Sequence, residues 1–297
     1  MGTLLNVEGR LVPPEQAFVP VLDRGFLYGD SVYDVVRTYG GRVFELSRHL
    51  ARMERTASRI GISLPPRATC EAELSRTMAA AGNAESYARL IVTRGEGRFG
   101  LAPHLAEGQS RLIIVVRPLE PPPAEQYERG LRVAVARTRR NPPQAVDPAL
   151  KTGNYLNGIL ALRESHAAGA DDALMLDLQG RVTELSTSNV FFVKDGVVVT
   201  PPLGLGILEG VTRALLIGIA RDEGVLLREE PHGADALLAA DEVFVTSTIR
   251  EVMAVTSLVL LERGAPEIRV VADGKPGTTT RRLHAAFRRY VERTHLR

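Results

Sequence analysis

Residues Glu184–Arg213 read E-L-S-T-S-N-V-F-F-V-K-D-G-V-V-V-T-P-P-L-G-L-G-I-L-E-G-V-T-R. The stretch opens on a carboxylate, Glu184, at the end of a strand-like run. Asp195-Gly196 lies between two apolar runs, which indicates a β-hairpin turn. A loop rich in Gly and Pro follows, and the stretch ends in Gly210-Val211-Thr212 before an amphipathic run. The first N–H groups of a helix lack partners within it and bind anions, so this end of the stretch predicts a phosphate site.

One stretch therefore offers an acid that can pair with a cation and a site that can hold a phosphate. A ligand with a basic ring at one end and a phosphate at the other suits both. Pyridoxal 5'-phosphate is such a ligand, and the enzymes that use it need a lysine for a Schiff base.

The lysines narrow the choice of that residue. The chain has 37 basic residues, of which only Lys151, Lys194 and Lys275 are lysines. Lys194 and Lys275 lie in turn sequences, whereas Lys151 lies at the edge of an ordered element, in Ala-Leu-Lys-Thr-Gly-Asn-Tyr-Leu. Arginine stays protonated and delocalised and forms no Schiff base. Lys151 is therefore the candidate catalytic lysine.

Several ordered blocks of the chain resemble the class IV, or fold-type IV, pyridoxal-phosphate aminotransferases. Besides the stretch at 184–213 and Lys151, these blocks are Asp23-Arg24-Gly25 with Tyr28-Gly29-Asp30, His49-Leu50-Ala51-Arg52, and Phe244–Thr248. That family includes branched-chain aminotransferases, D-amino-acid aminotransferases and aminodeoxychorismate lyases. The resemblance covers nearly the whole chain. It implies an α+β, two-domain fold like that of D-amino-acid aminotransferase, and pyridoxal 5'-phosphate as the cofactor.

The resemblance also implies roles for individual residues. Lys151 would form the Schiff base and then act as base and acid in the proton shift. Glu184 would pair with the pyridine nitrogen and keep it charged. Arg52 would bind the phosphate. The remaining cofactor-binding candidates are Tyr155, Val211, Thr212, Thr248 and Ile249. Without the resemblance, Lys151 would be interpreted as a loop lysine and Arg52 as a solvated helix arginine.

The first half of the chain carries the substrate-binding candidates. Tyr33 and Arg37 belong to one set of alternate positions on an expected strand, so their side chains point the same way. By resemblance, Tyr28, Tyr87 and Arg89 match pocket positions of branched-chain aminotransferases. Arg98 matches an arginine that binds the carboxylate in D-amino-acid aminotransferases, but Gly100 stands where its companion histidine would be.

The sequence leaves four functions open. The leading hypothesis is a transaminase that acts on branched-chain L-amino acids with 2-oxoglutarate. The alternatives are a D-amino-acid or R-amine transaminase, an aminodeoxychorismate lyase that releases pyruvate and 4-aminobenzoate, and a non-catalytic protein that binds pyridoxal phosphate. The enzyme is expected to be a homodimer in which loops of the partner complete the pocket.

Composition sets the remaining expectations. The apolar share of 44% and charged share of 24% are ordinary for a globular protein, and the net charge of +2 argues against a nucleic-acid partner. No apolar run reaches the roughly 18 residues that a membrane span needs, so no membrane partner is expected. We expect the basic run Arg137–Arg140 to be a solvated loop. The single cysteine, Cys70, excludes a disulfide framework and fits the cytoplasm. The scattered histidines offer no metal-binding spacing.

The proline-rich run Pro118–Pro123 is the clearest linker. We expect a small N-terminal α+β domain over 1–118, a linker over 119–126, and a larger cofactor-binding domain over 127–297. Helical periodicity over Leu46–Ile60 predicts a helix with Ser47 as its N-cap.

Overall fold

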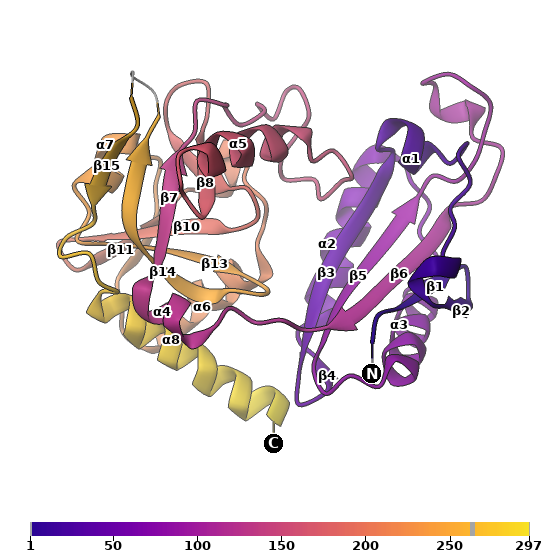
Figure 1. The fold of residues 1–297 in the computed structure, drawn as a ribbon, viewed down its shortest axis with the longest axis horizontal. Coiled ribbons are helices and arrows are strands. Elements are labelled where there is room, and N and C mark those ends of the chain that lie inside the picture. Colours follow the sequence, from indigo (N-terminus) through magenta and orange to yellow (C-terminus); the bar gives the residue numbers. More distant parts are fainter. Residues whose placement is uncertain (1, 262–264, 297) are drawn as a thin grey trace. The chain divides into compact units, whose positions relative to one another are not determined.

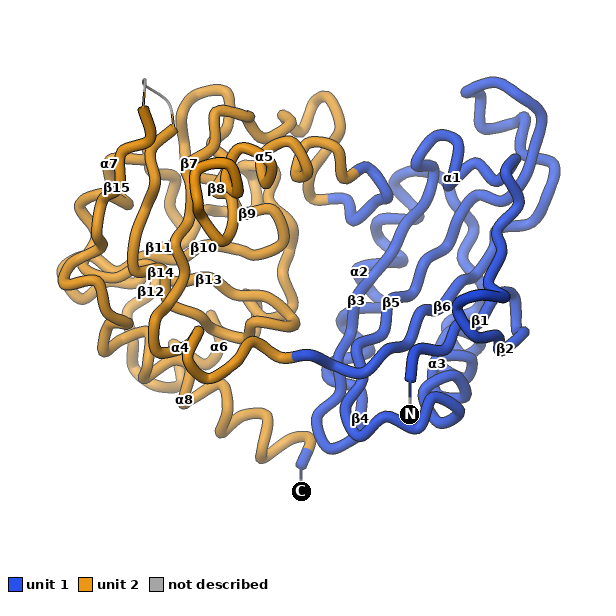
Figure 2. Tube along the Cα trace, in the orientation of Figure 1, with its two compact units in different colours: residues 1–120, 150–154, 296 blue, residues 121–149, 155–295, 297 orange. Residues whose placement is uncertain are grey.

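The structure, a computed structural model, describes residues 2–261 and 265–296. The chain divides into two compact units (Figure 2). Unit 1 comprises Met1–Glu120, Leu150–Asn154 and Leu296, and unit 2 comprises Pro121–Ala149, Tyr155–His295 and Arg297. Lys151 therefore belongs to the first unit, although the residues on both sides of its short segment belong to the second.

Unit 1 contains one six-stranded sheet with the order β2-β1-β6-β5-β3-β4 (Figure 1). Every neighbouring pair in it is antiparallel. Its strands are β1 (Leu4–Val7), β2 (Arg10–Val12), β3 (Ser31–Tyr39), β4 (Arg42–Val43), β5 (Ser86–Thr93) and β6 (Arg111–Pro118).

Two helices, α2 (Leu46–Ile60) and α3 (Arg67–Ala81), pack on one face of this sheet and form the core of unit 1 with it. A short helix, α1 (Arg24–Tyr28), precedes β3, and two 3₁₀ turns lie at Pro14–Gln16 and Pro103–Leu105. The prediction that Ser47 caps α2 was wrong. The helix begins at Leu46, and its N-cap is Glu45, in a left-handed conformation with a φ of 51°.

The alternation of side chains along β3 separates the face packed against α2 and α3 from the opposite face of the sheet. Val32 and Val36 join the core against the helices, whereas Tyr33 and Arg37 lie on the opposite face. In an antiparallel pair, directly opposed residues share a face. The register opposes Val35 to Arg89 and Arg37 to Tyr87, so these residues line the face opposite α2 and α3, which we call the open face of the sheet although Tyr33 and Arg37 on it are buried.

The described residues of unit 2 form nine strands, in the order β12-β11-β10-β13-β14-β7-β8-β9, with β15 paired to β14. A further pairing joins β9 to β10, so the strand order closes on itself from β10 round to β9. The closing pair is Glu184 opposite Asn189. The strands are β7 (Leu131–Val135), β8 (Asp172–Leu176), β9 (Val182–Leu185), β10 (Asn189–Lys194), β11 (Val197–Thr200), β12 (Leu227–Glu229), β13 (Glu242–Ser247), β14 (Glu251–Leu260) and β15 (Glu267–Val270).

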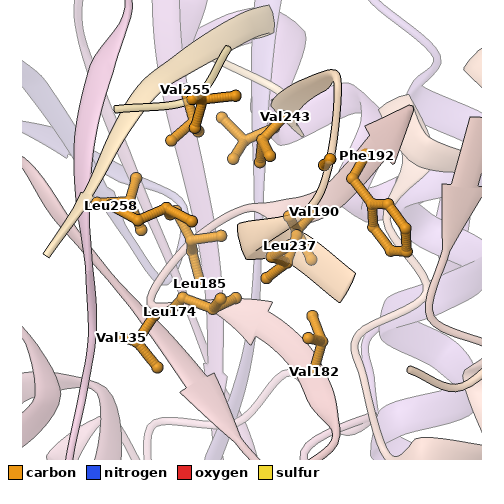
Figure 3. Close-up of a cluster of buried hydrophobic side chains, with 14 of the residues drawn as sticks. Val135, Leu174, Val182, Leu185, Val190, Phe192, Leu237, Val243, Val255 and Leu258 are labelled. Atoms are coloured by element: carbon orange, nitrogen blue, oxygen red, sulfur yellow. The ribbon is translucent and has the colours of Figure 1, made fainter. Parts of the chain in front are cut away.

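The apolar core of unit 2 is built from alternate residues of these strands (Figure 3). Val135, Leu174, Val190 and Val255 belong to it and are almost fully buried. The predicted hairpin turn joins β10 to β11. Asp195 and Gly196 have φ values of 49° and 77°, as a tight two-residue hairpin turn requires.

Of the helices of unit 2, α5 contacts β8 and α8 contacts β14, whereas α7 contributes Leu237 to the core itself. The helices are α4 (Ala124–Arg129), α5 (Leu156–Ala167), α6 (Val211–Asp222), α7 (Ala234–Leu238) and α8 (Thr278–Val291), with short turns at Leu203–Leu205 and Glu292–Leu296. Helix α4 begins at Ala124, inside the segment that the sequence assigned to the linker. The mixture of helices with antiparallel and parallel strands agrees with the predicted α+β class.

Candidate active site

Lys151 is held beside strand β3 of unit 1 by backbone hydrogen bonds. The amide of Tyr33 donates to the carbonyl of Lys151 at 3.0 Å, and the amide of Gly153 donates to the carbonyl of Ser31 at 3.0 Å. The side chain is half-buried, and its Nζ lies 4.5 Å from the centroid of the Tyr33 ring. An ammonium at this distance from an aromatic face is attracted to it. The segment around Lys151 is therefore an added piece of the sheet edge rather than a free loop.

Arg52 lies in a buried polar cluster on the helix-covered face of the same sheet. Its Nε and Nη2 atoms donate to the two carboxylate oxygens of Asp34, at 2.9 and 2.7 Å. His49 Nδ1 lies 2.8 Å from the same carboxylate. All three side chains are at most 6% exposed. The solvated-arginine interpretation of Arg52 does not apply, because its fork is fixed by a bidentate ion pair.

The charge of Asp34 depends on these partners. Burial alone raises the pKa of a carboxyl group, but the charges and hydrogen bonds of Arg52 and His49 outweigh burial and hold the pKa of Asp34 well below its usual range. Sequence reasoning missed Asp34. The signal was available: Asp34 alternates with Val32 and Val36 on the core face of β3, and a buried carboxylate requires a cationic partner on the helix that covers it.

The open face of the sheet pairs basic groups with tyrosine rings. The Arg89 guanidinium carbon lies 4.2 Å from the centroid of the Tyr33 ring, on the ring that Lys151 also approaches. Arg117 lies 4.7 Å from the centroid of the Tyr87 ring, and Arg37 lies 4.0 Å from that of Tyr39. The expectation that Tyr33 and Arg37 point the same way is therefore confirmed, and Tyr87 and Arg89 lie on the same face.

Tyr28 and Arg98 lie elsewhere in unit 1. Tyr28 is the last residue of α1, and its hydroxyl accepts a hydrogen bond from the amide of Gly100 at 3.3 Å. Arg98, in the same glycine-rich loop, is 67% exposed and pairs with Glu107 at 2.7 Å. This loop is anchored by the buried Arg24, which donates to the carbonyls of Gly100 and Leu101 at 2.9 and 2.8 Å.

In unit 2, Glu184 is buried at the point where the strand order closes. Its carboxylate accepts from Arg140 Nη2 at 2.7 Å, from the amide of Leu208 at 3.0 Å and from Asn189 Nδ2 at 3.3 Å. Asn189 also donates to the carbonyl of Leu208 at 3.0 Å, so it braces the loop as the sequence suggested. These donors fix the position of the Glu184 carboxylate.

The prediction of a solvated loop at 137–140 was wrong for Arg140, whereas the Arg137 side chain is exposed as predicted. Arg140 is 17% exposed on its side chain and forms the ion pair with Glu184. Arg137 Nε donates to the carbonyl of Leu261 at 2.5 Å. Sequence alone gave no reason to separate these arginines from a surface run, because their partners are far away in the chain.

The N-terminus of α6 has the features of an anion site. No side chain caps it, and its first turn contains no acidic residue. Thr212 lies in that turn and is 4% exposed. A Cβ added at the N-cap residue, Gly210, would lie 2.0 Å from Asn189 Oδ1. The anion site and the Glu184 carboxylate are therefore neighbours that share Asn189.

Thr248 and Ile249 lie in the tight turn between β13 and β14. The register pairs Asn189 with Thr246, so this turn and the turn before β10 lie at the same end of the sheet. Tyr155 is the N-cap residue of α5 and is half-buried.

Comparison with known proteins identifies the family. The family model for amino-transferase class IV matches residues 31–258. The chain belongs to this family.

The class IV aminotransferases similar to it cover nearly its full length. A protein of Methanocaldococcus jannaschii, provisionally named a branched-chain-amino-acid aminotransferase, is 35% identical over 287 residues, which are 96% of this chain and 95% of the relative. D-alanine aminotransferase of Staphylococcus aureus (strain COL) is 32% identical over 96% of this chain and 97% of its own. The T.th. branched-chain amino acid aminotransferase, solved with N-(5'-phosphopyridoxyl)-L-glutamate, is 30% identical. It superposes with a TM-score of 0.86 over 98% of this chain and 94% of its own.

Membership confirms the predicted fold-type IV, two-domain α+β architecture and establishes this chain as an aminotransferase. Enzymes of this class depend on pyridoxal 5'-phosphate. The donor set of unit 2 fits that group, since a buried carboxylate suits a protonated ring nitrogen and an uncapped helix start without acids suits a phosphate. No cluster of His, Cys, Asp or Glu that could hold a metal ion occurs within the described ranges 2–261 and 265–296. In the same ranges, no helix has the length and apolar character needed to cross a membrane.

Proposed function

We propose that this aminotransferase moves the amino group of a branched-chain L-amino acid to a dicarboxylic 2-oxo acid such as 2-oxoglutarate. The observation that supports this is the open face of unit 1 next to Lys151. Tyr33 and Tyr87 offer aromatic walls for a branched alkyl group, and Arg89 offers a guanidinium for the second carboxylate of the acceptor.

Relatives support the same substrates. The Methanocaldococcus jannaschii relative bears a branched-chain name, and the ligand of the T.th. structure is built on L-glutamate. Glutamate is the amino acid that 2-oxoglutarate becomes when it accepts an amino group. A pocket that takes both an alkyl and a carboxylate side chain requires apolar walls and a cation together, which the open face provides.

The chain's own residues take distinct parts in this proposal. Bound pyridoxal 5'-phosphate supplies an electron-withdrawing ring that stabilises negative charge at the substrate α-carbon. Lys151 Nζ removes the proton from that carbon and returns it, and Tyr33 limits where the Nζ can move. Glu184 keeps a positive charge on the ring nitrogen.

The phosphate is held by charge and by backbone donors. Arg52 provides the charge, and Asp34 fixes its orientation. Val211, Thr212, Thr248 and Ile249 would provide N–H groups and hydroxyls, and Tyr155 would lie near the ring hydroxyl. Donors that are already fixed bind a phosphate without the entropic cost of ordering flexible side chains.

A D-amino-acid or R-amine transaminase is the second candidate, because the Staphylococcus aureus relative acts on D-alanine by name and Arg98 matches a D-specific position. Arg98 is exposed and already paired with Glu107, and Gly100 replaces the companion histidine. Both observations favour the branched-chain assignment. The aminodeoxychorismate lyase would use the same cofactor residues. The intact set of Lys151, Glu184 and Arg52 argues against a non-catalytic protein.

A panel of amino donors with matched variants tests the proposal. L-leucine, L-isoleucine and L-valine should react with 2-oxoglutarate. Arg89→Ala should raise the KM for 2-oxoglutarate about tenfold or more and the KM for leucine much less. Only 2-oxoglutarate has a second carboxylate that can pair with Arg89, whereas the side chain of leucine is uncharged. Arg98→Ala should change either rate only modestly.

Other outcomes would favour the alternatives. Turnover of D-alanine with inert L-leucine, abolished by Arg98→Ala, would establish the D-specific function instead. Pyruvate release from aminodeoxychorismate without an amino acceptor would establish the lyase.

We also propose that the enzyme is a homodimer. Unit 1 exposes large apolar side chains on and near α1 and on the loop that Arg24 anchors. Phe18, Phe26, Phe99 and Leu101 are 75%, 70%, 76% and 78% exposed. An apolar group of this size on a folded surface is typical of a protein interface. A second copy of the chain is the partner that a closed two-fold pair would supply.

A further inference from the structure

Two turns of unit 2 carry candidate cofactor residues but are far apart in sequence. One turn spans 186–188. It follows Glu184 and Leu185 and leads into Asn189. The other spans 248–250 and contains Thr248 and Ile249. Since β10 and β13 are antiparallel and Asn189 pairs with Thr246, the two turns leave the sheet at the same end.

Arg250 joins these turns through one nitrogen. Its Nη1 donates to the carboxylate of Asp172, and to the hydroxyl of Ser188 at 3.2 Å. The Arg250 side chain is 24% exposed, whereas Asp172 is fully buried. A charge-assisted bond to a buried carboxylate is short and directional, so the guanidinium cannot shift without leaving that carboxylate unpaired.

Asp172 extends the connection into the first turn. Its other oxygen accepts from the Ser186 hydroxyl at 2.6 Å and from the amide of Ala173 at 2.8 Å. The amide of Ser186 in turn donates to the carbonyl of Ala173 at 3.0 Å. Asp172 therefore binds Arg250 on one side and the turn that follows Glu184 on the other.

The backbone of Arg250 is fixed as well. Its amide donates to Ser247 Oγ at 3.1 Å, and its carbonyl accepts from the hydroxyl of Tyr127 at 3.0 Å. The next residue, Glu251, has a left-handed φ of 56°, and His284 and Arg288 of α8 hold its carboxylate at 3.0 and 2.8 Å. The backbone of Arg250 is therefore fixed, and its side chain bonds Asp172 and Ser188 at the turn 186–188 from that fixed position.

We propose that Arg250 and Asp172 are positioning residues that hold the Thr248-Ile249 turn in register with the turn next to Glu184. The inference rests on the proposed cofactor roles of Glu184, Thr248 and Ile249. Two turns placed independently would drift relative to each other, and a small misplacement of fixed donors costs much of their benefit. The Arg250–Asp172 pair thus fixes the hydrogen-bond donors of both turns relative to each other, so that together they can hold the two ends of the cofactor.

The test compares Arg250→Met, Arg250→Lys and Arg129→Met. Arg129 pairs with Asp171, the neighbour of Asp172, through an exposed bridge of 3.4 Å, so its variant is the matched control. Two quantities are measured: the dissociation constant of pyridoxal 5'-phosphate from the apo-protein, and hydrogen exchange of the apo-protein at residues 185–189 and 247–251.

Arg250→Met should weaken cofactor binding on the order of tenfold or more. It should also speed exchange in both segments, including 185–189, which contains no substituted residue. Arg250→Lys should lie between Arg250→Met and the wild type, because a lysine keeps the charge but not the fork. Arg129→Met should match the wild type in both measurements.

Unchanged affinity in folded Arg250→Met, or faster exchange only at 247–251, would overturn the proposal. If Arg250→Met does not fold, Asp172→Asn provides the same test, because it keeps an oxygen for Ser186 and Ala173 but removes the charge. A lower melting temperature of Asp172→Asn with wild-type affinity would likewise overturn it. If the wild-type chain does not bind the cofactor, the proposed cofactor site is refuted instead. Hydrogen exchange of the apo-proteins would then by itself test whether Arg250 and Asp172 hold the two turns together.

Discussion

Asp34 is the residue on which the geometry of Arg52 depends. It sits on the core face of β3, where a carboxylate without partners would be strongly unfavourable. Arg52 and His49 offset that cost, and in return Asp34 fixes both side chains. The effect of this buried group on stability should therefore vary with pH in a defined direction.

We predict that Asp34→Asn lowers the free energy of unfolding by about 3 kcal/mol near neutral pH, because the buried Arg52 loses the carboxylate that forms a bidentate ion pair with it. The pKa of Asp34 is lowered in the folded state, so its stabilising effect is complete above the unfolded pKa of about 4 and is lost as the pH falls further. Urea unfolding measures the free energy of unfolding of wild type and Asp34→Asn near pH 7, pH 5 and pH 3. The difference between the two proteins should be the same near pH 7 and pH 5 and smaller near pH 3.

The control for this prediction is Glu54→Gln, which breaks the exposed pair with Arg67. It should cost less than about 1 kcal/mol, as surface pairs do. A difference between wild type and Asp34→Asn that grows toward low pH would contradict the assigned charge of Asp34.

Lys151 gives the second residue-scale prediction. Borohydride reduction of the cofactor-loaded protein should attach the cofactor to Lys151, as mapped by peptide mass spectrometry, and Lys151→Ala should abolish transamination. Its position beside Tyr33 and its fixed backbone distinguish it from Lys194, which pairs with Asp241 on an exposed turn. Labelling of Lys194 or Lys275 in the wild type would show that the assignment is wrong.

At the scale of elements, the start of α6 and the closing pair of the barrel-like sheet form one assembly. Gly210 lies against Asn189, and Asn189 holds both Glu184 and the carbonyl of Leu208. The φ of Gly210 is −67°, which any residue adopts, so glycine is needed there for space rather than for conformation.

We therefore predict that Gly210→Ala weakens pyridoxal 5'-phosphate binding about tenfold or more, because the added methyl group displaces Asn189 and frees Glu184. Gly218→Ala is the matched control in the same helix. Nothing lies within 4 Å of its new Cβ, so it should leave binding unchanged and stabilise the helix by up to about 1 kcal/mol. Equilibrium dialysis of both apo-proteins measures the difference, and equal affinities would exclude the role of Asn189.

At the scale of the whole molecule, the exposed apolar group of unit 1 determines the oligomeric state that we expect. Phe26→Asp and Phe99→Asp should each shift the protein toward monomers in light scattering, because a charge replaces apolar contact area. Leu226→Asp, at a side chain 55% exposed in unit 2, should leave the mass unchanged. A monomeric wild type with full activity would refute the dimer.

The sequence by itself predicted the family and a candidate catalytic lysine. Three lysines reduced the catalytic candidates to Lys151, and the local signals at Asp195-Gly196 and Gly210-Val211-Thr212 placed a hairpin and the start of a helix where the structure has them. Such signals are readable because turns and helix starts depend on residues that are adjacent in the chain. Alternation along β3 likewise predicted that Tyr33 and Arg37 share a face.

Only the tertiary structure decided which charges are paired. Arg140 had the sequence context of a surface arginine and is the partner of Glu184. The alternation along β3 placed Asp34 on the core face, but only the packing of α2 on the sheet identified Arg52 as its partner. The Arg250–Asp172 bridge joins residues on two different hairpins. A buried ion pair is set by how strands and helices pack, and the pairing energy comes from excluding water around both groups, which no stretch of sequence does alone.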